Sequence, residues 1–127
     1  MNAISNGFIV HRDTLIEKQS VRDFLQASLQ GFLYATKSPD KMAQIIGKYR
    51  ESSDPVITKR GAELSWSLWV TPTTTNKSLG SMAAEDWSAT AEALRKYGGV
   101  TNDLNPSQLY TNEFVPAAPE FIPLQNV

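Results

Sequence analysis

A single short apolar stretch, Gly7–Val10, is the one convincing β-strand candidate in this sequence. Its residues are apolar and partly β-branched, and the preceding Asn6-Gly7 pair is typical of a turn. Each backbone group that a buried strand leaves unpaired costs about 1–3 kcal/mol, so such a strand needs neighbours. The rest of the chain predicts helices. Either the partner strands lie outside these 127 residues, or the strand prediction is wrong.

The first half of the chain carries two clear helix patterns. Apolar residues recur at the 3.6-residue period between Val21 and Leu33, and Ser20 is a candidate N-cap. Ser38-Pro39-Asp40 then combines a capping serine, a proline and an acidic residue, which together indicate the start of a second helix. We expect these two helices to form an antiparallel pair joined by a short link.

The segment from Asp54-Pro55 to about Val70 allows two predictions, a strand or a helix. Leu64–Leu68 alternates apolar and polar residues, which is typical of a strand. The proline signal and the spacing of the apolar residues indicate a helix, and we favour the helix.

Turn and loop signals divide the remainder of the chain. Thr71–Ser78 is polar and threonine-rich, and predicts a loop. A further helix that carries Trp87 should end at Gly98-Gly99. A short capped turn follows at Asn105–Leu109, and Val115–Val127 holds three prolines and predicts an extended tail.

Composition excludes several classes of function. Twelve Lys and Arg residues against thirteen Asp and Glu leave no excess of positive charge for nucleic acid or an anionic membrane. No apolar run approaches the roughly 18 residues that span a bilayer. With no cysteine and only His11, the sequence offers no thiolate site and no histidine-rich metal site. We assign no catalytic residue, metal or cofactor.

Several short stretches, in order, resemble the C-terminal part of the periplasmic substrate-binding proteins of ABC importers for nitrate, sulfonates, taurine and thiamine-pyrimidine precursors. They cover about three quarters of the chain. The matching stretches are Val21–Ala27, Ser38-Pro39-Asp40, Leu79–Met82 with Glu85-Asp86-Trp87, Tyr97–Val100 and Leu109–Val115.

The resemblance implies an α/β fold in which this chain is an incomplete, mostly helical piece of a type II binding-protein lobe. Gly7–Val10 would be its one short strand, in a sheet completed by a missing N-terminal segment. Residues 1–115 would belong to the lobe, and residues 116–127 would form a proline-rich tail. The chain would then be a fragment, periplasmic by resemblance. Its start has no signal peptide, which predicts a cytoplasmic product if it is expressed as given.

The function implied is that of a solute-binding component for a small anionic or heteroaromatic compound, a truncated one that does not bind alone. Its partners would be the solute, an ABC permease and ATPase, and the missing segment. Two alternatives stay open. One is a fragment of a thiamine-pyrimidine synthase-like enzyme, which the absence of cysteine disfavours. The other is a stand-alone helical interaction module that uses the Val21–Leu33 face.

Four residues are the candidate ligand-binding set: Ser5, Asn6, Glu63 and Trp66. Ser5 and Asn6 precede the predicted strand, and could donate hydrogen bonds at a cleft or simply form a turn. Glu63 could bind a ring nitrogen through a charge-assisted hydrogen bond, or pair locally with Arg60 or Lys59. Trp66, with Trp69, could stack on a flat ligand or pack in the core.

Overall fold

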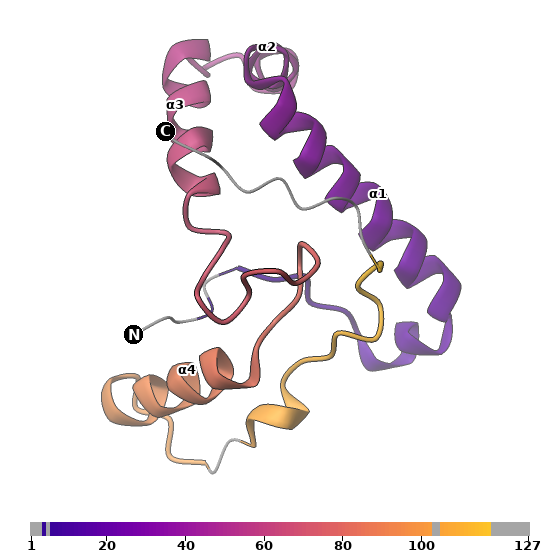
Figure 1. Cartoon of the computed structure of the whole chain (residues 1–127), viewed down its shortest axis with the longest axis vertical. Helices are drawn as coiled ribbons and strands as arrows, with labels where there is room; N and C mark the ends of the chain where they lie inside the picture. The colour runs from indigo at the N-terminus through magenta and orange to yellow at the C-terminus, as the bar shows by residue number, and fades with distance from the viewer. Residues whose placement is uncertain (1–3, 5, 103–104, 118–127) are drawn as a thin grey trace.

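The computed structural model describes residues 4, 6–102 and 105–117 of the chain. Within these residues the protein is helical, with four α-helices and two short 3-10 helices and no β-strand (Figure 1). The elements are η1 (Arg12–Ile16), α1 (Lys18–Lys37), α2 (Pro39–Tyr49), α3 (Pro55–Trp66), α4 (Ala84–Tyr97) and η2 (Pro106–Gln108).

The helices form two parts that are joined by long connections. The first three helices follow one another closely, and α2 packs against both α1 and α3. The fourth, α4, lies apart from α1 to α3 and packs against η2 (Figure 1). The loop between α3 and α4 and the segment after η2 run between the two parts (Figure 1).

Proline signals place the starts of α2 and α3 correctly, although the Ser38 side chain makes no capping hydrogen bond at α2. Pro39 is the first residue of α2 and Pro55 is the first residue of α3, as predicted. The Asp54 carboxylate caps α3 by accepting hydrogen bonds from the backbone N–H groups of Val56 (2.8 Å) and Ile57 (3.0 Å). The helical reading of this segment is confirmed, although α3 ends at Trp66 rather than near Val70.

The start of α1 differs from the prediction. The helix begins at Lys18, so Ser20 lies inside it and is not the N-cap. The preceding η1 helix provides the reason, because the Glu17 N–H donates to Thr14 O and Glu17 itself becomes the flanking residue of α1. The short η1 helix is therefore separated from the 20-residue α1 helix by Glu17 alone.

The predicted strand at Gly7–Val10 is wrong. These residues are irregular, and the Ile9 side chain is 100% exposed. Phe8 packs edge-to-face on Phe24 of α1, with ring centroids 5.4 Å apart. In the described part of the chain no second segment forms backbone hydrogen bonds of the β type with this stretch. Its β-branched residues therefore do not form a strand. An α/β type II binding-protein lobe is therefore not the fold of the described residues.

The core is small, and it is divided among the helices and loops. Its buried apolar members come from α1 to α4 and from the connections: Leu29, Met42, Ala43, Trp66, Leu79, Ala83, Ala91 and Phe114. Many large apolar side chains stay on the surface, including most of those on α3. The chain is thus held together by a few local clusters rather than by one continuous core.

Candidate functional site

An aromatic cluster forms where α3 ends. The Trp66 side chain is buried, with 5% exposure, and Trp69 is partly buried beside it at a centroid distance of 6.3 Å. The backbone N–H of Trp69 donates to Trp66 O (3.1 Å), which turns the chain back on itself. Trp69 also meets Phe32 of α1 edge-to-face at 5.3 Å, and Phe32 is itself exposed. The cluster therefore has a buried member and two members at the surface.

The threonine-rich loop after this cluster is anchored by a buried carboxylate. Asp86, in the first turn of α4, is 5% exposed. Its Oδ2 accepts hydrogen bonds from the hydroxyls of Thr73 (2.6 Å) and Thr71 (3.4 Å). The Thr71 N–H in turn donates to Thr74 Oγ1 (2.9 Å). Through this network the loop that follows Trp69 is fixed to the start of α4.

Residues 110–114, which we call the C-terminal strap, connect α4 to α1. The Tyr110 ring stacks on Trp87 with centroids 5.5 Å apart and an interplanar angle of 8°. The Asn112 side chain forms two reciprocal hydrogen bonds with the backbone of Met82, at 2.9 and 2.8 Å. Phe114 is buried under the Arg22 guanidinium, which lies 5.3 Å from the ring centroid.

The acidic residue of the strap adds an ion pair. Glu113 Oε1 accepts a hydrogen bond from Lys18 Nζ (2.7 Å) and lies 3.6 Å from Arg22 Nη2. The hydrogen bond from Lys18, with the positive charges of both residues, lowers the pKa of Glu113 below its ordinary value. These side chains are partly exposed, so the ion pair fixes the geometry of the strap more than it adds stability.

The four predicted ligand-binding residues do not form one site in the described structure. Ser5 lies outside the described residues, and Asn6 is an exposed residue of the irregular N-terminal segment. Glu63 pairs with Arg60 at 3.5 Å, which is the local ion pair that its sequence context also allowed. Trp66 is in the core. The groups that the prediction missed are Asp86 and its threonine partners, for which the run of threonines was the available signal.

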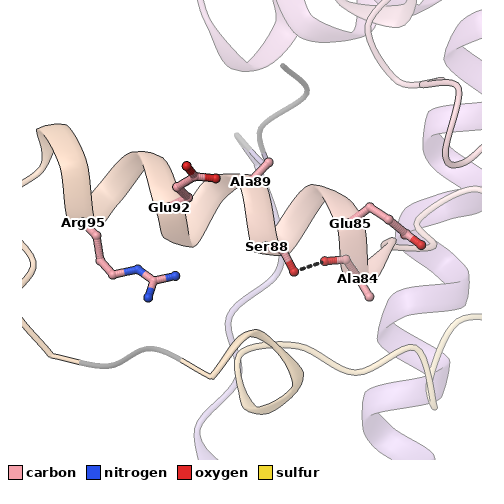
Figure 2. Close-up of a pocket in the computed structure, with 6 residues that line it drawn as sticks. All are labelled: Ala84, Glu85, Ser88, Ala89, Glu92 and Arg95. Carbon is pink, nitrogen blue, oxygen red and sulfur yellow. Dashed lines mark hydrogen bonds between the residues drawn. The ribbon is translucent and has the colours of Figure 1, made fainter.

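A shallow hollow lies on the outer face of α4 (Figure 2). All of its lining residues come from this one helix: Ala84, Glu85, Ser88, Ala89, Glu92 and Arg95. The Ser88 hydroxyl donates to Ala84 O (2.9 Å) within the helix (Figure 2). The hollow shares no residue with the aromatic cluster or with the predicted ligand-binding set. Its open shape gives a small molecule little to enclose.

The described residues hold neither a metal-binding cluster nor a membrane-spanning helix. No cluster of three or more His, Cys, Asp or Glu side chains is placed to hold a metal ion within the part of the chain that the structure describes. No described helix combines the length and the apolar character needed to cross a membrane.

Comparison with known proteins gives one informative similarity. The chain is 26% identical over 119 residues to the riboflavin-binding protein RibY of Chloroflexus aurantiacus. The match covers 91% of this chain and 34% of that protein, so the chain spans about a third of its relative's length. No family model matches the chain. No solved structure matches it.

These findings correct the resemblance drawn from sequence motifs. Membership in the ABC substrate-binding proteins for nitrate, sulfonates, taurine and thiamine-pyrimidine precursors is not supported, because no family model matches and the relative is named for riboflavin. The relative's name describes a protein that binds a small molecule, riboflavin. The ABC permease and ATPase partners, the compartment and the absence of catalysis remain predictions that no finding tests.

Proposed function

We propose that this chain contributes part of the binding surface for a flat, nitrogen-containing heteroaromatic molecule of the flavin class, and that it binds this molecule without chemical reaction. The observation that supports the proposal is the similarity to a riboflavin-binding protein, which covers 91% of this chain. A flavin presents a large apolar ring with polar edges. Such a ligand calls for an aromatic surface with polar groups nearby.

Trp69 and Phe32 are the residues we assign to the ring. Phe32 is exposed and Trp69 is partly buried, whereas Trp66 is buried and packs beside Trp69. Their edge-to-face contact orients the two rings at 74° to each other, so that one ring can stack on a ligand while the other borders it. This assignment moves the predicted aromatic role from Trp66 to its neighbour Trp69.

The threonine loop is the polar part of the proposed surface. It follows Trp69 by two residues, and the hydrogen bonds to Asp86 fix its position relative to α4. Thr75 and Asn76 lie at its exposed end, where Asn76 adopts the left-handed backbone conformation, with a φ of 66°. Side-chain hydroxyls and amides of this kind can donate to and accept from the edge of a flavin ring.

The experiment uses the three tryptophans as built-in reporters. The 15N-labelled chain is titrated with riboflavin, and the three indole N–H signals are followed by NMR, with ribitol as the ligand that lacks the ring. We expect the Trp69 indole signal and the amides of residues 71–76 to shift with riboflavin alone. The Trp87 indole, stacked on Tyr110, should not shift.

A variant pair tests the assignment. Trp69→Leu should abolish the riboflavin-dependent shifts, and Tyr97→Leu, which removes an exposed aromatic ring on α4, should leave them intact. Because the chain spans about a third of its relative's length, we expect fast exchange and an affinity too weak for calorimetry. Equal shifts at Trp69 and Trp87, or equal shifts with ribitol, would refute the proposal.

A further inference from the structure

One side of α3 is an uncovered apolar stripe. Ile57, Gly61 and Leu64 follow each other at helical spacing of four and three residues, and so lie along one line of α3. Leu68 follows two residues after the end of the helix, in the turn that the Leu68 N–H closes by donating to Ser65 O (3.0 Å). The three large side chains are 72%, 52% and 78% exposed. A side chain placed at Gly61 would meet nothing within 4 Å. The helix turns its other side to α2, through the ion pair of Lys59 with Asp40.

The stripe is complementary to itself when it is reversed. Ile57 and Leu68 lie at equal distances from the midpoint between residues 62 and 63, and so do Gly61 and Leu64. In an antiparallel pair of α3 helices related by a two-fold axis at this midpoint, each Leu64 would face the open space at the other Gly61. Each Ile57 would face the other Leu68. Large side chains thus meet small ones at the centre, as close helix packing requires.

The charges beside the stripe fit the same arrangement. Arg60 and Glu63 lie on one flank of α3, with Val56 and Ser67 on the same side. Within one chain Arg60 already pairs with Glu63 at 3.5 Å. In an antiparallel pair this flank meets its own copy, so each Arg60 would also come close to the Glu63 of the other chain. The opposite flank carries Thr58 and Ser65 and no charged residue. No like charges face each other in this geometry.

We propose that α3 is a homodimerisation surface, on which a second copy of this chain packs through the stripe Ile57, Gly61, Leu64 and Leu68. In Figure 1, α3 lies at the outer edge of the molecule, where a second copy can approach. The contact is one helix wide, so the dimer is weak and forms with increasing concentration. The proposed dimer does not depend on the proposed flavin-binding role.

Sedimentation velocity of the whole chain over a concentration series tests the proposal. Wild type should pass from monomer to dimer. Leu64→Glu should weaken the dimer at least about a hundredfold, because each dimer loses two buried leucines. Gly61→Leu should do the same by filling the space that the partner leucine enters, at a position where an added Cβ meets nothing within 4 Å in the monomer. Ile16→Glu makes the same kind of change at an exposed site in η1 and should leave the dimer intact.

A charge exchange distinguishes this geometry from non-specific association. Arg60→Glu and Glu63→Arg should each weaken self-association severalfold, since each places like charges opposite one another across the axis. A mixture of the two variants should form a heterodimer more tightly than either variant forms a homodimer. A wild-type chain that is monomeric at all concentrations, a dimer unaffected by Leu64→Glu and Gly61→Leu, or a mixture no tighter than its components would overturn the proposal.

Discussion

Replacing Asp86 by alanine should destabilise the protein by about 2 kcal/mol. The carboxylate is buried and accepts a 2.6 Å hydrogen bond from the Thr73 hydroxyl. A hydrogen bond to a charged group contributes about 1.5–3 kcal/mol. The negative charge in the first turn of α4 adds about 0.3–1 kcal/mol through the helix dipole. Alanine recovers up to roughly 0.7 kcal/mol through its higher helix propensity.

A control on the same helical turn separates these contributions. Glu85 also lies in the first turn of α4, but it is exposed. Glu85→Ala removes a similar helix-dipole interaction and gains less helix propensity than Asp86→Ala, because glutamate is already a good helix former, so we expect it to cost less than about 1 kcal/mol. The difference between the two variants therefore measures the contacts of the buried carboxylate with the threonine loop.

Urea unfolding followed by circular dichroism is the assay, with Thr73→Val completing a double-mutant cycle. A loss of about 2 kcal/mol should lower the unfolding midpoint by roughly 1 M urea. The coupling energy between Asp86 and Thr73 should be about 1–2 kcal/mol. If Asp86→Ala and Glu85→Ala differ by less than about 0.5 kcal/mol, the loop is not anchored by this carboxylate and the reasoning fails.

Two further predictions concern the C-terminal strap. Because the folded pKa of Glu113 lies below the ordinary value of 4.5, its ion pair stabilises the fold above pH 4.5, and this contribution is lost as the pH falls through the folded pKa. An acid titration of Trp87 fluorescence should show this loss in wild type and not in Glu113→Gln, and identical titrations would contradict it. Asn112→Ala removes both hydrogen bonds to Met82 and should lower the free energy of unfolding by about 1–2 kcal/mol. It should also weaken the near-ultraviolet circular dichroism signal of the Trp87–Tyr110 stack. The control variant Gln108→Ala should have neither effect. An unchanged signal in Asn112→Ala would show that the stack holds without this contact.

The features that were predicted correctly are those fixed by neighbouring residues. The starts of α2 and α3 depend on prolines and on an aspartate that reaches only two and three residues along the chain. The end of α4 depends on Gly98-Gly99, where Gly99 has the positive φ that a helix stop requires. Such interactions can be read from a short window of sequence.

The errors arise where the outcome depends on residues far away in the chain. Gly7–Val10 has the composition of a strand, but a strand exists only if another segment pairs with it, and composition does not supply that segment. The Asp86–Thr73 contact spans thirteen residues, and the Lys18–Glu113 contact spans ninety-five. The spacing of apolar residues within a short window does not predict contacts between residues so far apart in the sequence. Trp66 and Trp69 were both named from sequence, but only the fold shows which of them reaches the surface.

The strap also explains why its motif is a poor guide to ligand. Tyr110, Asn112, Glu113 and Phe114 each contact another part of this chain, and Thr111 accepts a hydrogen bond from the Glu113 N–H (3.1 Å). Side chains that are occupied in joining α4 to α1 would be selected in any protein that packs these helices in this way, whatever it binds. A resemblance carried by these residues therefore reports how the helices are joined. The class of ligand has to be established at residues outside the strap. For the proposed surface these are Phe32, Trp69 and the exposed residues Thr75 and Asn76 of the threonine loop.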